Sequence, residues 1–349
     1  MVIPVRDRFY PRRGTELVDV AIGIATFNEV QNISNILDAL VAQKGNDEIK
    51  IVQIIVSDDS SDGTERIVKK WASRDRRIKI FHHSTRQGYN AALNEIFAQG
   101  AKVSVIIDAD VLPADDRVIL RLVSPMIRDP DIGICAGAPC ALETKKLMGR
   151  VAYFTYTVWN NVRRRLKGGS NFFSVNGRIF AVSSAISGRT KIPVEVVGGD
   201  AYAYLSCVKL GKRVQFVPDA IVYYQETQNL HDFLIRRLRY EQNANQLIRM
   251  FGDLAKTEIA IPRALLMRST LKEGLRDPLS LFIVPTLTML SKLHYRAAKT
   301  PPHRHFAIAT STKRLDSELI ARAKQITLIL STRRTCDDDS FRRNGVFLT

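Results

Sequence analysis

The sequence predicts an α/β protein with a doubly wound, mostly parallel sheet, followed by a helical C-terminal region. Two observations support this prediction. Apolar runs alternate with segments of helical periodicity through the first third of the chain, and a polar loop follows most of these runs. Because the carboxyl ends of parallel strands meet at one edge of a sheet, we expect these loops to lie together where ligands bind.

The expected elements follow one another with short connections. The first apolar run ends at a polar cluster, and helical spacing of apolar residues begins at Ile33, with Asn32 as the expected N-cap. The unit then recurs. The expected strands are residues 20–24, 49–56, 78–81, 103–107, 132–138 and 214–220, and the expected helices are residues 33–41, 65–72, 90–99 and 201–208.

Two carboxylates, Asp108 and Asp110, directly follow the fourth strand. The Asp-x-Asp pattern is weak by itself, since it also occurs at Asp129 in a turn-like segment and at residues 337–339 in a polar tail. Only the first copy has a strand in front of it. Carboxylates at a strand end suit a hard cation, and Glu29, Asp58, Asp59 and Arg86 are expected at the same edge.

Acids in strand–helix loops have an alternative interpretation as helix caps and turn residues, as for Asp62 before Gly63. For Asp58 and Asp59 this alternative stays open. Other nucleotide folds are excluded on motif grounds. The chain has neither a GxxxxGK[ST] loop nor a GxGxxG after the first strand, so metal and side chains would have to hold any phosphates.

Composition limits the class of protein. The 349 residues are 45% hydrophobic, enough for one large domain with an appendage, and the net charge is +17. Such a charge favours nucleic acid, an anionic membrane or phosphorylated ligands, although it can also serve solubility alone. Four cysteines without CxxC spacing indicate neither zinc nor disulfides, and residues 1–19 do not resemble a signal peptide. These features predict a cytoplasmic location.

Four ordered motifs resemble the family 2 glycosyltransferases. They are residues 25–29, residues 58–64, Gly88 with residues 91–94, and residues 108–110. The resemblance covers roughly residues 18–246. It implies the GT-A fold of nucleotide-diphospho-sugar transferases and inverting transfer of a sugar.

The resemblance also implies roles for the first half of the site. Thr26 and Glu29 would lie near the nucleotide, and Asp58, in preference to Asp59, would bind the base, usually uracil. Asp108 and Asp110 would meet the ribose and a diphosphate bound to Mg²⁺ or Mn²⁺. The family often has a basic residue after the glycine that matches Gly88, where this chain has Tyr89, so Arg86 becomes the candidate for that charge.

In the second half, the resemblance places Asn176 and Gly177 near the donor sugar and makes Asp200 the general base. Only the second acid of the family's pair is kept, and an N-cap role for Asp200 is the alternative. Arg239 matches the arginine of a Gln-x-x-Arg-Trp motif and is expected to pair with diphosphate. Arg236 and Tyr240 replace the other two residues, which leaves processive chain growth in doubt.

The expected organisation is a leader (1–17), a glycosyltransferase domain (18–250) with nucleotide (18–140) and acceptor (141–250) halves, a helical appendage (251–335) and a flexible tail (336–349). Residues 278–291 carry no charge but are shorter than the roughly 20 residues of a spanning helix. Basic residues flank them, so an interfacial segment on an anionic leaflet and a buried helical hairpin covering the sheet are both open. The aromatic and basic segment 145–167 has similar alternatives, as a sugar-site, nucleic-acid or membrane segment or simply a packed helix.

The expected function is therefore metal-assisted, inverting transfer from a UDP-sugar to a carbohydrate or lipid-linked acceptor, in glycan, cell-envelope polysaccharide or glycolipid synthesis. The enzyme would act in the cytoplasm or at the cytoplasmic face of a membrane. Two alternatives remain: an inactive or regulatory protein on the GT-A fold, and a basic nucleic-acid-binding protein. The basic residues are spread over several segments, however, and form no recognisable nucleic-acid module.

Overall fold

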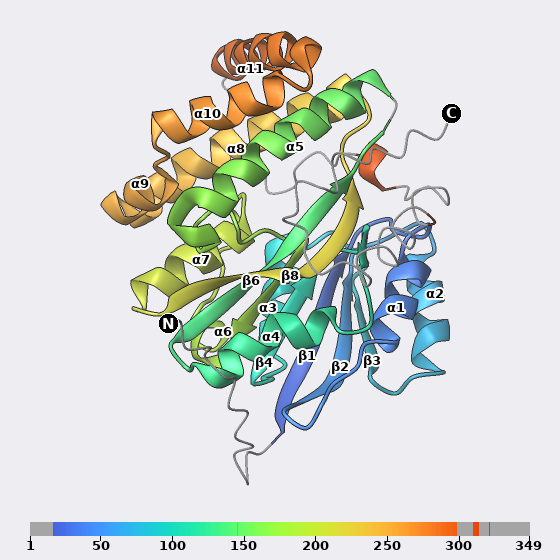
Figure 1. Cartoon of the computed structure of the whole chain (residues 1–349). Coiled ribbons are helices and arrows are strands. Elements are labelled where there is room, and N and C mark those ends of the chain that lie inside the picture. The colour runs from blue at the N-terminus through green and yellow to red at the C-terminus, as the bar shows by residue number, and fades with distance from the viewer. Residues whose placement is uncertain (1–16, 145, 299–309, 314–320, 322–349) are drawn as a thin grey trace, which may run out of the picture.

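A computed structural model describes residues 17–144, 146–298, 310–313 and 321. The expected leader, the tail with Asp337–Asp339 and most of residues 299–335 lie outside the described residues. The strands are β1 (Val18–Thr26), β2 (Ile49–Asp58), β3 (Ile78–His82), β4 (Val103–Ile107), β5 (Val111–Pro113), β6 (Ile132–Leu142), β7 (Ile179–Ser183) and β8 (Arg213–Gln225). They form one eight-stranded sheet in the order β3-β2-β1-β4-β7-β6-β8-β5 (Figure 1).

Helices join the strands and extend beyond the sheet. In chain order they are α1 (Ile33–Val41), α2 (Thr64–Ala72), α3 (Tyr89–Phe97), α4 (Val118–Arg128), α5 (Leu147–Arg165), α6 (Ser184–Ser187), α7 (Gly199–Lys209), α8 (Leu230–Phe251), α9 (Asp253–Ile259), α10 (Arg263–Gly274) and α11 (Pro278–Ala298). Two 3₁₀ turns, η1 (Leu166–Gly169) and η2 (Thr310–Thr312), complete the described elements. All strands and helices predicted from periodicity are present, with ends that differ by a few residues.

The first half of the sheet is parallel, as predicted. β1 pairs with β2 on one side and β4 on the other, and β2 pairs with β3. The second half is mixed, because β7 runs antiparallel to both β4 and β6, whereas β6 and β8 are parallel. The loops after β1, β2 and β4 consequently emerge at one edge.

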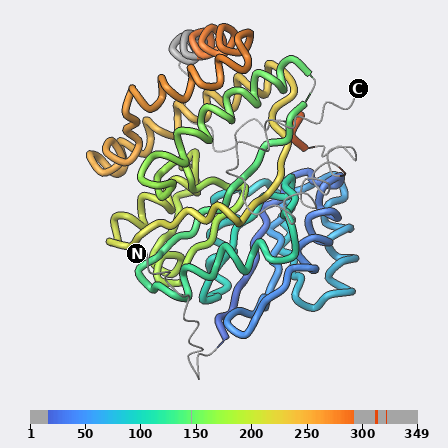
Figure 2. The backbone as a smooth tube through the Cα atoms, viewed as in Figure 1, coloured from blue at the N-terminus to red at the C-terminus, as the bar shows by residue number. Residues whose placement is uncertain are grey.

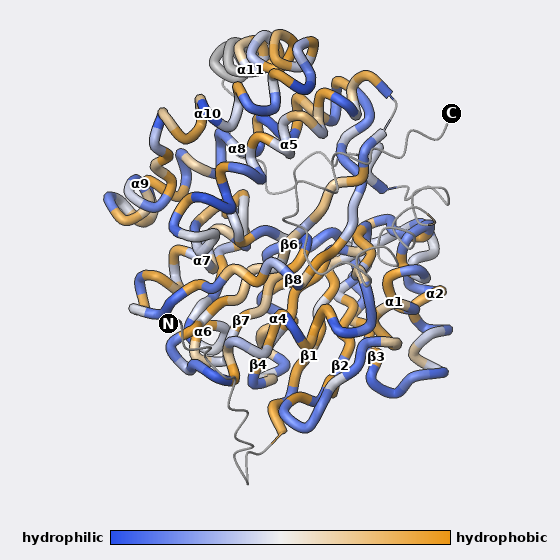
Figure 3. The backbone as a smooth tube through the Cα atoms, in the orientation of Figure 1, coloured by the Kyte–Doolittle hydropathy of each residue, from blue (hydrophilic) through white to orange (hydrophobic). Residues whose placement is uncertain are grey.

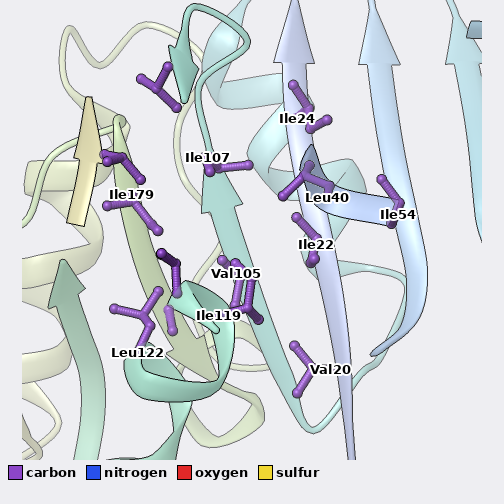
Figure 4. Close-up of a cluster of buried hydrophobic side chains, with 14 of the residues drawn as sticks. Val20, Ile22, Ile24, Leu40, Ile54, Val105, Ile107, Ile119, Leu122 and Ile179 are labelled. Atoms are coloured by element: carbon purple, nitrogen blue, oxygen red, sulfur yellow. The ribbon is translucent and has the colours of Figure 1, made fainter. Parts of the chain in front are cut away.

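Two hydrophobic clusters cover the two faces of the sheet. One contains Ile22 and Ile24 of β1 with Leu37 of α1 and Leu122 of α4, and Figure 4 shows Ile22, Ile24 and Leu122 beside Val105 and Ile107. The other contains Ile55 and Phe180 with residues of α3 and α7. Helices therefore cover both faces, which confirms the doubly wound arrangement.

The C-terminal helices stack on α5 and α8 at one end of the molecule, away from β1–β3 (Figures 1 and 2). α11 is continuous through Pro285 and contacts α5, α8 and α10. The predicted alternative of a hairpin covering the sheet is therefore wrong, because helices α5 and α8, rather than strands, supply the contacting surface. Within the described residues, no helix is long and apolar enough to cross a membrane.

Candidate active site

A cavity of about 800 Å³ opens where β1 and β4 end. Its other walls come from α5, from α8 and from residues of α11. The predicted site residues that line it are Thr26, Glu29, Asp59, Arg86, Asp108, Asp110, Asn176, Gly177, Asp200 and Arg239. The fold thus brings Glu29, Asp59, Arg86, Asp108 and Asp110 to one cavity, as predicted from the strand ends, but Asp58 does not line it.

The loops after β1 and β2 are held together by reciprocal hydrogen bonds. The Asn28 backbone N–H donates to Ser60 Oγ at 2.8 Å, and Asn28 Oδ1 accepts from the Ser61 N–H at 3.0 Å. Asn28 adopts a left-handed conformation with φ of 56°, which asparagine tolerates better than most residues. Asn32 is the N-cap residue of α1, as predicted, but it makes no side-chain capping hydrogen bond. Its side-chain amide instead donates to Glu29 Oε2 at 2.9 Å.

Asp58 and Asp59 point to different surroundings. Asp58 is fully buried and accepts hydrogen bonds from Thr26 Oγ1 at 2.6 Å and from the Ser60 hydroxyl, with His82 Nδ1 at 2.8 Å. It is absent from the cavity wall, whereas Asp59 lines it. This geometry favours Asp59 for contact with a ligand, and base binding by Asp58 remains a prediction.

Asp59 also shapes the loop that carries Arg86. Its Oδ2 accepts from the backbone N–H groups of Gln87 at 2.9 Å and Gly88 at 2.7 Å. The Arg86 guanidinium then lies 4.3 Å from the centre of the Phe27 ring, within range of a cation–π interaction. A cation is thereby placed on the cavity wall.

Acidic side chains are crowded beside the end of β4. Burial, followed by the charge of Asp110, raises the pKa of Asp108 to about 7. Burial and Asp110 likewise raise the pKa of Glu29 to about 7, although Lys313 opposes this shift. Three carboxyl groups close together in a buried site favour proton uptake or cation binding, because either relieves the repulsion among them.

Asp200 lies in the first turn of α7 and faces the same cavity. Its Oδ2 accepts from the Gly177 N–H at 3.0 Å and its Oδ1 accepts from the Ala201 N–H at 2.8 Å. The N-cap of α7 is Gly198, so the alternative that Asp200 itself is the cap is wrong. Burial raises the pKa of Asp200, and the charge of Arg239 opposes that shift.

Comparisons with known proteins identify the family. The family model of Glycosyl transferase family group 2 matches residues 104–310, and that of Glycosyl transferase family 2 matches residues 21–186. The chain belongs to the family 2 glycosyltransferases. No curated protein sequence matches it.

A solved structure supports the GT-A fold of this glycosyltransferase. The mannosyltransferase PcManGT from Pyrobaculum calidifontis, in complex with GDP-Man and Mn²⁺, is 19% identical with a TM-score of 0.54, over 91% of this chain and 87% of that chain. Glucosyl-3-phosphoglycerate synthase from Mycobacterium tuberculosis is 15% identical with a TM-score of 0.46, over 68% of this chain and 80% of its own. TarS 1-349 of S. aureus in complex with UDP is 17% identical, with a TM-score of 0.44 and 66% of each chain covered.

The candidate metal ligands of the glycosyltransferase suit a hard divalent cation. Asp108 and Asp110 offer carboxylate oxygens, which Mg²⁺ and Mn²⁺ prefer. The described part of the chain holds no cluster of three or more His, Cys, Asp or Glu residues suited to a metal. Two carboxylates with substrate phosphate and water as the remaining ligands match the usual coordination of Mg²⁺ at phosphate-transfer sites.

Gly177 is required at its position by close packing. A Cβ atom there would lie 2.8 Å from Tyr89 Oη and 3.2 Å from Asp108 Oδ1. The Tyr89 hydroxyl is buried and has no hydrogen-bond partner among the described residues. Tyr89 therefore places a hydroxyl, rather than the cation often found in the family, beside Gly177.

Lys313 is a site residue that the sequence did not indicate. Its Nζ lies 2.9 Å from Glu29 Oε1, donates to the Phe27 carbonyl and is 5.4 Å from the centre of the Phe27 ring. η2, just before it, is anchored by Ser311 Oγ, which donates to Asp232 Oδ2 at 2.6 Å. No local pattern signals this contact, since it joins the two ends of the described chain.

Proposed function

We propose that this glycosyltransferase moves a sugar from a nucleotide-diphosphate donor, a UDP-sugar in the first instance, to an acceptor hydroxyl with inversion at the anomeric carbon. The observation that carries the proposal is that Asp108, Asp110 and Asp200 line the same cavity. Donor identity and stereochemistry are predictions of this arrangement. PcManGT, which was solved with GDP-Man, makes guanine the first alternative base to test.

Asp200 is proposed to activate the acceptor. The acceptor oxygen bonds to the anomeric carbon as the bond from that carbon to the diphosphate oxygen breaks, and the hydroxyl proton passes to the Asp200 carboxylate. The raised pKa of Asp200 makes its carboxylate a stronger proton acceptor than an ordinary aspartate. The Gly177 and Ala201 N–H groups fix its orientation.

Asp110 and Asp108 are proposed to hold Mg²⁺ or Mn²⁺, which neutralises charge on the departing diphosphate when bound. Arg239 lies close enough to lower the pKa values of both Asp108 and Asp200. Its charge therefore acts on both carboxyl groups, and Arg239 lines the same cavity. Arg86 and Lys313 add positive charge beside Phe27.

The acceptor is proposed to be a carbohydrate or a lipid-linked sugar. Trp159 and Phe173 line the cavity with ring centres 5.3 Å apart, and Tyr156 lies on the same wall. Such rings can stack on the apolar faces of sugars. Residues 18–250 are proposed as the catalytic domain, but Ile261 and Thr288 also line the cavity, so the helical appendage contributes to the site.

A panel of nucleotide sugars tests the proposal. Thermal shift with UDP- and GDP-sugars, with and without Mn²⁺, reports binding, and donor hydrolysis or transfer reports activity. We expect Asp110→Asn to abolish metal-dependent stabilisation by the donor and to lower turnover. Asp131→Asn, an exposed acid in the turn after α4, is the matched control. Full activity of folded Asp110→Asn would refute the metal role.

A further inference from the structure

The outer side of α11 is mainly apolar, with the exposed Thr286 within it. Leu279, Phe282, Met289 and Leu290 are exposed there, and Phe282 is 74% accessible. Their spacing along the helix places them on one side. A solvated helix ordinarily shows polar side chains on this side, so the exposed stripe requires an explanation of its own.

α10 and the turn after it extend the same kind of surface. Met267, Leu271 and Leu275 follow one another at intervals of four residues and are 60%, 54% and 87% exposed. α10 and α11 contact each other at the end of the molecule farthest from β3 (Figure 1). Figure 3 shows hydrophobic stretches along both helices. We call the exposed apolar residues of α10, α11 and their connection the α10–α11 surface.

Packing among the described residues leaves this surface exposed. The adjacent side of α11 carries Ile283, Val284 and Leu287, which pack against a cluster that includes Phe233 and Val151. α11 is therefore attached to the rest of the molecule by a different set of side chains. Large exposed apolar patches mark sites of association with a protein or a membrane.

The charges around the α10–α11 surface favour an anionic partner. Arg263 and Arg268 are exposed. The acids within the described part of these helices and their connection are engaged elsewhere: Glu273 is buried and pairs with Arg276 at 3.2 Å, and Asp277 pairs with Arg150 at 2.7 Å. Exposed apolar groups thus lie among exposed cations.

We propose that the α10–α11 surface docks on an anionic lipid bilayer. The apolar side chains enter the boundary between headgroups and acyl chains, while Arg263 and Arg268 contact lipid phosphates. This mode requires no spanning helix, in keeping with the lack of one among the described residues. The inference is independent of which sugar the enzyme transfers.

Vesicle binding by the full chain is the test. We expect co-sedimentation with phosphatidylcholine vesicles that contain phosphatidylglycerol, weaker binding to phosphatidylcholine alone, and loss of the difference at high salt, because lipid charge is screened. Failure of the wild-type chain to bind anionic vesicles at low salt would overturn the proposal.

Substitutions locate the contact. Phe282→Glu should lower the partition coefficient into vesicles by about tenfold or more. The bilayer would lose a phenyl group and gain a charge, and together these changes cost more than the free energy of a tenfold change in affinity. Leu210→Glu, at the C-cap of α7 and 42% exposed, makes a comparable change elsewhere and should bind normally. Arg263→Gln with Arg268→Gln should weaken binding to anionic vesicles and spare binding to neutral ones. Equal binding by Phe282→Glu and Leu210→Glu would overturn the proposal.

If the α10–α11 surface is covered by something other than lipid, the measurements will differ. If a second copy covers the surface, sedimentation velocity without lipid will show a dimer that Phe282→Glu dissociates. If the chain's own C-terminal segment covers it, a polarity-sensitive dye on Phe282→Cys will report an apolar environment in the lipid-free monomer and will not respond to vesicles. Either result overturns the proposal, whereas a monomer whose dye responds only to anionic vesicles supports it.

Discussion

Asp200 Oδ2 accepts a hydrogen bond from the backbone N–H of Gly177 at 3.0 Å, and this contact joins the two halves of the candidate site. Gly177 lies between η1 and β7, and Asp200 lies in the first turn of α7. The same glycine lies against Asp108, so one residue separates the proposed metal ligand from the proposed base. We therefore expect the position of the acceptor relative to the donor to depend on Gly177.

Asp200→Asn should lower kcat by roughly a hundredfold to ten-thousandfold, the usual range for a general base. Asparagine can still accept from the Gly177 N–H, so donor binding should change little. Turnover and the donor Kd, measured on the same preparation, separate these effects. Asp253→Asn, an exposed acid at the start of α9, is the control. A folded Asp200→Asn enzyme with normal turnover would exclude the base role.

Gly177→Ala should impair the enzyme through Tyr89. The added Cβ would approach Tyr89 Oη and Asp108 Oδ1, and overpacking of this kind costs about 1–3 kcal/mol. We expect a higher donor KM and a lower melting temperature. Tyr89→Phe in the same chain removes one of the two close contacts and should restore part of both. If the double variant is no better than Gly177→Ala, the Tyr89 contact is not the cause.

Local patterns were sufficient for much of the fold. Apolar spacing places β1 to β4 and their helices, because both periodicities are set by a few neighbouring residues. The antiparallel insertion of β7 between β4 and β6 was not predictable in this way. The register of β7 is set by pairing with β4 and β6, which are distant in the sequence, so no short motif predicts it.

In the site too, local patterns predict some residues and long-range contacts decide the others. Strand ends predict that Asp59, Asp108 and Asp110 meet, since loops after parallel strands share an edge. The choice between Asp58 and Asp59 depends on which carboxylate Thr26 and His82 engage, a tertiary contact. Long-range packing brings Lys313 to Glu29, with nothing local to indicate it.

The stability of the metal-free protein should depend on pH through Asp108. Its pKa is about 7 when folded, against about 4 for an ordinary aspartate. Between these values the folded chain binds a proton that the unfolded chain lacks, so this group's contribution to the free energy of unfolding falls as pH rises from about 4 to about 7. Asp108→Asn should flatten this part of the profile.

Thermal unfolding in EDTA across this pH range checks the effect. Asp131→Asn, an exposed carboxylate that pairs with Lys212 on the surface, should keep the wild-type slope. Mn²⁺ should stabilise the wild-type protein increasingly as pH rises, because protons compete for the same oxygens. An identical slope for wild type and Asp108→Asn would contradict the raised pKa.

Lys313→Ala should raise the donor KM by about tenfold or more, since a charge-assisted contact with phosphate contributes more than a neutral one. We expect this effect because Lys313 Nζ lies on the cavity wall, 2.9 Å from Glu29 Oε1, where its charge opposes the rise in the pKa of Glu29. Its loss removes a cation from the donor end of the cavity and raises the pKa of Glu29 further. Asp200 is untouched, so kcat should fall less than KM rises.

Lys313→Arg keeps the charge and should restore most of the donor affinity, which a purely structural role in anchoring η2 would not require. Lys256→Ala removes an exposed lysine that pairs with Asp253 at 2.8 Å and is the matched control. Steady-state kinetics with the donor varied at saturating acceptor give KM and kcat separately. Equal loss of kcat and donor affinity, unrelieved by arginine, would assign Lys313 to folding of this region instead of donor binding.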